Sequence, residues 1–244
     1  MESKVVLLLI ADAWMIYAGY VYGTRFIRQY SNYFLGIEWM VIALSGSNVV
    51  VLGLIGGDHS SPSYGLMLFF DAFSRSFGIT LILVLGMLRV THRYKPTPAV
   101  DVGAFGLAIV TGLYLAVFGQ PITTPWAIFY IVMNALASLF MFYVALRLWA
   151  AAERRHAVWV VIATVGAAAV AGTYDFIHIP GDDENHTIFY VIAITLWALQ
   201  MTTYFFAYRA LHNHDARVDG DRSNAGTGSY DSVEAGDAQP RSDR

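Results

Sequence analysis

Residues 125–146 read PWAIFYIVMNALASLFMFYVAL, and not one of their side chains is charged. An α-helix rises about 1.5 Å per residue, so about 20 such residues cross the roughly 30 Å hydrocarbon core of a bilayer. An apolar run of this length therefore predicts a transmembrane helix. Thr123 and Thr124 precede the run and Arg147 follows it, which places the span at about 125–148.

Six further apolar runs lie on either side of this one, separated by stretches rich in turn-forming or charged residues. Helices do not easily continue through breaks of this composition. The sequence therefore predicts an all-α, polytopic membrane protein, a seven-transmembrane-helix bundle occupying residues 1–212. The expected spans are 5–23, 34–56, 65–89, 100–119, 125–148, 157–178 and 187–208.

The composition excludes several classes of function. Hydrophobic residues make up 57% of the chain and charged residues 14%, which is wrong for a soluble protein of this size. The net charge of −3 is not concentrated into a basic face, so we expect no nucleic-acid partner. Without cysteine there is no disulfide, thiolate nucleophile or iron–sulfur cluster. The expected surroundings are the lipid bilayer, and the oligomeric state stays open.

Basic residues follow every second span and indicate the orientation. The positive-inside rule places such residues in the cytoplasm. The other connections are neutral or acidic, as at 182–184. We therefore expect a multi-pass protein of the cell (inner) membrane, with its N-terminus outside and its C-terminus cytoplasmic. The basic residues in question are Arg25, Arg28, Arg89, Arg93, Lys95, Arg147, Arg154, Arg155 and Arg209.

The last part of the chain, residues 213–244, changes to Asp, Arg, Gly, Ser and Ala. Such a segment has little apolar surface to bury, so burial cannot offset the entropy lost on ordering. We expect a disordered cytoplasmic tail.

Two pairs of segments are similar at a constant separation. Residues 39–46 and 159–166 share Trp, Val, Ile, Ala and Gly at an offset of 159 − 39 = 120, and 89–92 and 209–212 share Arg and His at the same offset. This register favours a 3+1+3 parallel repeat with span four as the inverter. Chance recurrence of common apolar residues is the alternative.

This plan resembles the sugar-transporting SWEET proteins and the vitamin carriers of the nicotinamide riboside type, although none of their sequence motifs is found. The topology also resembles microbial rhodopsins. Those proteins hold retinal on a lysine of the seventh span, and residues 187–208 contain no lysine. All seven histidines fall in loops or at span ends, which is unlike a haem site. We expect no cofactor.

An ionisable residue deep in a bilayer costs several kcal/mol and is a candidate functional residue. Asp71, Ser74, Arg75 and Gly78 lie at i, i+3, i+4 and i+7, so they share one face of a predicted helix and Asp71 neutralises Arg75. At about 1.5 Å per residue, other polar residues lie at a similar depth. The predicted ligand-binding or intramembrane polar network is Asp12, Asn48, Asp71, Ser74, Arg75, Asn134 and Thr195. An ion-pair network that fastens the helices is the alternative.

Two further positions carry hypotheses. Tyr174, Asp175 and His178 lie at the outer mouth of span six, but no compact His motif accompanies them, so we expect no metal site. Glu38 lies near the inner boundary of span two, where it is either a gate or half of an interfacial ion pair with Arg28 or Arg93.

Three functions fit this pattern. The first is a carrier or ligand-binding membrane protein with a polar intramembrane pocket for a small polar, anionic or isoprenoid ligand. The second is a membrane-embedded enzyme acting on a lipid or isoprenoid, with Asp12, Asp71 or Asp175 as acid or base. The third is a receptor or assembly subunit without transport activity. Catalytic residues are not assigned, and the carrier is favoured over the enzyme.

Overall fold

The computed structural model describes residues 3–55, 60–174, 176, 179–180, 182–183 and 186–236, with the backbone alone at 55 and 222–236. These described residues form helices and contain no strand. The elements are α1 (Ser3–Tyr30), α2 (Tyr33–Ile55), α3 (Pro62–Phe73), the π-helix η1 (Ser74–Ile82), α4 (Leu83–Thr91), α5 (Pro98–Phe118), α6 (Thr124–Ala150), α7 (Arg154–Thr173) and α8 (Thr187–Gly236).

Seven helices among the described residues are long and apolar enough to cross a membrane, with α3, η1 and α4 forming one continuous span from Pro62 to Thr91. Each predicted span overlaps one of them, so the all-helical prediction is confirmed and fits a helical membrane bundle. The helices extend past several predicted ends. For example, α1 continues to Tyr30, and Arg28 in its last turn interacts favourably with the helix dipole.

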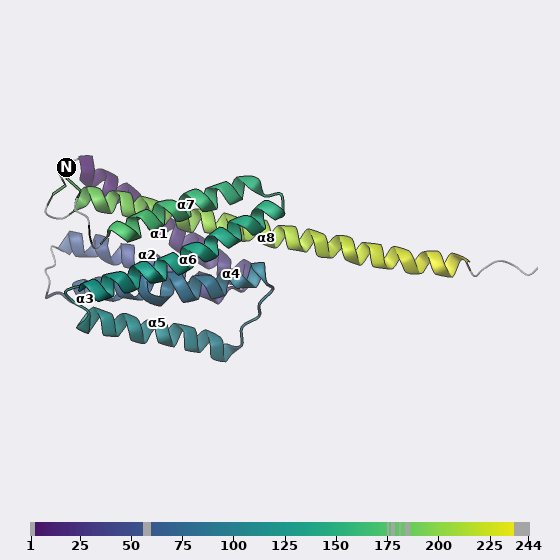
Figure 1. Ribbon diagram of the computed structural model, residues 1–244, viewed down its shortest axis with the longest axis horizontal. Coiled ribbons are helices and arrows are strands. Elements are labelled where there is room, and N and C mark those ends of the chain that lie inside the picture. The colour runs from purple at the N-terminus through teal and green to yellow at the C-terminus, as the bar shows by residue number, and fades with distance from the viewer. Residues whose placement is uncertain are drawn as a thin grey trace, which may run out of the picture.

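The helices lie roughly side by side in an elongated bundle (Figure 1). α1 packs against α2 and α8, α7 packs against α6 and α8, and α5 covers α3 and η1 at one edge. The starts of α1, α3, α6 and α8 lie at one end, here termed the N-terminal end, and the starts of α2, α5 and α7 lie at the opposite end.

Small residues let α1 and α2 approach closely. A methyl group added at Gly19 would lie 2.5 Å from the carbonyl oxygen of Trp39 and from the Cβ of Ala43, so only glycine fits there. The indole of Trp39 is 3% exposed and donates a hydrogen bond to the carbonyl of Met201, 3.2 Å away on α8. These contacts fix α2 against α1 and α8.

The predicted repeat stays a prediction. Trp39 is buried against α8, whereas Trp159, its counterpart at the offset of 120, is 45% exposed. The two residues of the strongest sequence match therefore lie in different environments.

The third span changes from α to π geometry at Ser74, which the sequence analysis did not anticipate. A π-helix closes i→i+5 rings and weakens the local ladder of backbone hydrogen bonds. Hydroxyl side chains satisfy carbonyls here: Ser76 donates to Phe73 at 3.2 Å and Thr80 donates to Ser76 at 2.7 Å. Two side-chain hydrogen bonds therefore accompany the π geometry of η1.

α8 continues as a helix beyond the bundle to Gly236 and runs through part of the predicted tail (Figure 1). Arg217 contacts Glu153 at 3.3 Å, and Arg93 contacts Asp219 at 2.8 Å, so two ion pairs tie the start of the extension to the bundle. Disorder of residues 213–244 stays a prediction, and 237–244 lie outside the described residues.

Candidate functional site

The guanidinium group of Arg75 is the centre of the candidate site. Its Cζ lies 4.0 Å from the ring centroid of Tyr130 on α6 and 4.5 Å from that of Tyr174, just beyond the end of α7. Its Nη1 lies 3.3 Å from the Oδ2 of Asp71. The Arg75 side chain is 12% exposed and that of Asp71 26%. One cation is thus held by a carboxylate and two aromatic rings.

The pairing of Asp71 with Arg75 was expected from their i, i+4 spacing, and it is present even though it crosses the junction of α3 and η1. The role of the pair in ligand binding stays a prediction. The face of an aromatic ring carries negative electrostatic potential, so each tyrosine stabilises the cation without a fixed hydrogen-bond direction. Asp71 is the more exposed member of the ion pair.

Tyr130 was missed by the sequence analysis. Its signal was available, because Tyr130 lies one turn before Asn134 on the same face of the fifth span. Tyr174 lies over Arg75, and its place at an outer mouth stays a prediction. Its ring also packs edge-on against Phe189 at 5.4 Å, which connects the site to α8.

The other predicted network residues make separate local contacts. Asn48 exchanges two hydrogen bonds with Ser63, at 2.8 and 2.6 Å, and so connects α2 to α3. The amide oxygen of Asn134 accepts from Ser138 at 3.4 Å, and Thr195 donates to the carbonyl of Val191 at 2.6 Å. A cavity common to all predicted residues stays a prediction.

Ser74 and Asp12 are the remaining members of the predicted network. Ser74 begins η1 directly after α3. Asp12 lies on α1 against α2, where a methyl group added at Gly46 would be 2.6 Å from its Oδ1. That oxygen is buried and has no hydrogen-bond partner within the described part of the chain. Asp12 therefore belongs to the α1–α2 interface.

Asp175 and His178 lie outside the described residues, but the acidic loop after them is described at Asp182 and Asp183. Asp183 accepts from the backbone N–H of Thr187 at 3.0 Å, and Lys4 lies 2.6 Å from its other oxygen. The hydrogen bond from Lys4, together with the Thr187 N–H, holds the pKa of Asp183 below its ordinary value. Both aspartates cap α8.

Metal coordination finds no support in the described ranges, where no three His, Cys, Asp or Glu side chains are placed to hold an ion.

Glu38 differs most from its expectation. Its side chain is 1% exposed, and neither carboxyl oxygen has a hydrogen-bond partner among the described residues. The expected interfacial ion pair with Arg28 or Arg93 is therefore wrong, and Arg93 pairs with Asp219 instead. Both carboxyl oxygens point at η1, where a methyl group added at Gly78 would lie 2.5 Å from Oε1 and 2.9 Å from Oε2.

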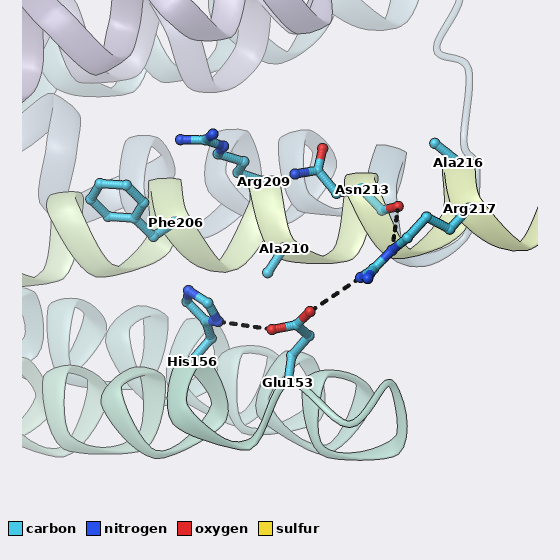
Figure 2. Close-up of a pocket in the computed structure, with 8 residues that line it drawn as sticks. All are labelled: Glu153, His156, Phe206, Arg209, Ala210, Asn213, Ala216 and Arg217. Atoms are coloured by element: carbon cyan, nitrogen blue, oxygen red, sulfur yellow. Dashed lines mark hydrogen bonds and ion pairs between the residues drawn. The ribbon is translucent and has the colours of Figure 1, made fainter.

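A hollow of about 620 Å³ lies between the start of α7 and α8 (Figure 2), at the end of the bundle opposite the N-terminal end. Glu153 bridges His156, at 3.2 Å, and Arg217, at 3.3 Å. Figure 2 shows the contact between Glu153 and Arg217 crossing from the start of α7 to α8, whereas Arg209 points away from Glu153. The residues lining the hollow are Glu153, His156, Phe206, Arg209, Ala210, Asn213, Ala216 and Arg217. The ion pair between Glu153 and Arg217 connects the start of α7 to α8.

The chain matches no family model, and no curated protein or solved structure is found to be similar to it.

Proposed function

We propose that the chain is a multi-pass membrane carrier that binds a small anionic ligand at Arg75. One observation carries the proposal: the guanidinium of Arg75 is held between Tyr130 and Tyr174, while the carboxylate of Asp71 that pairs with it is partly exposed. A permanently charged, planar donor group in the interior of a bundle is suited to carboxylate or phosphate recognition.

Ligand binding is an exchange of counter-ions in this proposal. Arg75 presents several N–H donors in a planar fork that matches a carboxylate or phosphate. An anionic ligand replaces Asp71 as the partner of Arg75, and the tyrosine rings keep the cation in place during the exchange. Asp71 therefore acts as a competitor that is displaced by the ligand and returns when the ligand leaves.

The position of the site supports transport. Arg75 lies close to the midpoint of the span Pro62–Thr91, at (62 + 91)/2 = 76.5. Secondary transporters bind their substrates near the bilayer midplane, at helices whose regular geometry is interrupted. Arg75 also lies in a π-helix, a geometry that is frequent at functional sites.

The site joins parts of the bundle that can move relative to one another. Asp71 and Arg75 belong to the third span, Tyr130 to α6, and Tyr174 follows α7. A ligand that changes how Arg75 is held therefore changes the contact between the third span and the α6–α7 pair. The proposed orientation has the N-terminus outside and the C-terminus in the cytoplasm of a cell (inner) membrane, on the basis of the basic residues after alternate spans.

The binding step can be tested with purified full-length protein in lipid nanodiscs. Thermal unfolding is measured with a panel of mono- and dicarboxylates, phosphate esters, their neutral amide or alcohol analogues, and isoprenoid alcohols. We expect an anionic compound to raise the unfolding temperature of the wild type while its neutral analogue does not. Arg75→Gln abolishes this rise.

Asn32→Ala is the matched control, because it removes a hydrogen bond to the third span, at the carbonyl of Gly86, without touching Arg75. It lowers the unfolding temperature but keeps the shift caused by the anion. Equal stabilisation of the wild type and Arg75→Gln by the anion contradicts the proposal, as does a panel in which isoprenoid alcohols alone stabilise both.

A further inference from the structure

The carboxyl group of Glu38 is enclosed in the bundle without a polar partner. It is 1% exposed, and both oxygens lack a hydrogen-bond partner in the described part of the protein. Its oxygens lie against Gly78, which is near the midpoint of the third span. An ionised carboxylate in such surroundings carries a large desolvation cost with no compensating charge. The carboxyl group fits this place with a proton bound.

The charged groups on the surrounding helices do not neutralise Glu38. α1, α3, η1 and α4 pack against α2. Asp71 and Arg75 pair with each other, Arg89 donates to the carbonyl of Ser31, and Asp12 lies against Gly46. No described hydrogen bond or ion pair connects Glu38 to any of them. The charged and titratable groups of these four helices are Lys4, Asp12, Tyr17, Tyr20, Tyr22, Arg25, Arg28, Tyr30, Tyr64, Asp71, Arg75 and Arg89.

The element opposite Glu38 is suited to movement. Gly78 offers no side chain, so the carboxyl group rests on the backbone of η1. η1 has π geometry over Ser74–Ile82. A π-helix can change to α geometry by exchanging its i→i+5 hydrogen bonds for i→i+4 bonds, without losing the helix. Such a change would move Gly78 relative to α2 and so alter the surroundings of the carboxyl group.

We propose that Glu38 is a proton-binding site, whose carboxyl group releases and takes up its proton when η1 moves against α2. The same helix segment carries Arg75, three residues before Gly78, so ligand and proton act on one element. In a carrier the proton would be the coupling ion, and this last step rests on the proposed function. Proton binding at Glu38 itself does not.

An apolar carbodiimide tests the site directly, because such reagents partition into the membrane and react with neutral carboxylic acids. The carboxyl proton passes to a carbodiimide nitrogen, the carboxylate oxygen adds to the central carbon, and the product rearranges to a stable N-acylurea on the side chain. Full-length protein in nanodiscs is treated at a series of pH values, and the modified residue is identified by peptide mass spectrometry.

We expect an adduct on Glu38 that is absent in Glu38→Gln, and an initial labelling rate that falls about tenfold per pH unit above the midpoint of titration. Asp71, which pairs with Arg75, stays unlabelled. Labelling at Asp12 in place of Glu38, no labelling of Glu38, or a labelling rate that is the same at every pH overturns the proposal.

Two controls separate this result from other causes. Glu38→Asp keeps a carboxyl group and should still be labelled, which shows that loss in Glu38→Gln reflects the lost acid rather than misfolding. Ligand-induced stabilisation is measured in parallel: if no anion binds at Arg75, carrier function fails while the labelling of Glu38 stands. If anions bind and Glu38 stays unlabelled, proton binding fails while the Arg75 site stands.

Discussion

The guanidinium of Arg75 lies 4.0 Å from the ring centroid of Tyr130, and this contact joins the π-helical part of the third span to α6. Tyr174 covers the cation from a third element at 4.5 Å. Two aromatic faces from neighbouring elements therefore hold Arg75, while its acidic partner Asp71 comes from its own span. The proposed exchange of counter-ions requires this division.

Two substitutions of Tyr130 distinguish the contribution of its aromatic face from that of its volume. Tyr130→Phe keeps the aromatic face over Arg75, whereas Tyr130→Leu keeps apolar bulk without it. We expect Leu to lower the free energy of unfolding by about 1–2 kcal/mol more than Phe, which is the range of a partly desolvated cation–π contact. Chemical unfolding in mixed micelles measures the difference. Equal losses for the two variants would show that the ring face contributes nothing.

A double-mutant cycle measures the ion pair. Asp71→Asn and Arg75→Gln are made singly and together, and their free energies of unfolding are compared. We expect a coupling energy of about 1–2 kcal/mol, since the pair is mostly buried but the carboxylate remains partly hydrated. Additive effects would mean that the two side chains do not interact in the folded protein.

Gly78→Ala places a methyl group 2.5 Å from the Oε1 of Glu38, so either η1 or the carboxyl group must shift. We expect a loss of about 1–3 kcal/mol in the free energy of unfolding, as for overpacking of a core. Glu38→Ala should relieve most of this loss in the double variant. Gly106→Ala is the control, since its added methyl group meets no atom within 4 Å. If the Gly78→Ala protein is as stable as the control, the carboxyl group of Glu38 does not lie against Gly78.

The Lys4–Asp183 ion pair predicts a dependence of stability on pH. The hydrogen bond from Lys4 lowers the pKa of Asp183 in the folded state relative to the unfolded chain. Its contribution is therefore present above the ordinary carboxyl pKa of about 3.9 and is lost as the pH falls below it. We expect Lys4→Met to reduce the fall in unfolding temperature between neutral pH and about pH 3. An identical fall in both proteins would place Lys4 and Asp183 apart in solution.

The helices could be predicted from the sequence because each depends on a local property, the length of an apolar run. The pairing of Asp71 with Arg75 could be predicted for the same reason, since i, i+4 neighbours share a face within one helix. The contacts with Tyr130 and Tyr174 could not, because they depend on how α6 and α7 are placed against η1. Spacing along one helix carries no information about its neighbours.

The position of Glu38 against Gly78 could not be predicted for a different reason. Its position in the sequence suggested a place near the membrane boundary, but depth estimated by counting residues assumes regular and parallel helices. α2 meets η1 so that Glu38 faces Gly78 near the middle of the third span. The π geometry of Ser74–Ile82 also changes which side chains share a face. The Ser, Gly and Thr residues of this segment do not predict a π-helix.

The most direct test of the central claim is the affinity for the anion that the ligand panel identifies. Calorimetric titration measures this affinity in the wild type, Asp71→Asn and Arg75→Gln. If Asp71 competes with the ligand for Arg75, its removal tightens binding. The affinity rises about tenfold if the competition costs about 1.4 kcal/mol of binding free energy. Loss of Arg75 abolishes binding. Binding that is weaker in Asp71→Asn than in the wild type, or unchanged in Arg75→Gln, would contradict counter-ion exchange at Arg75.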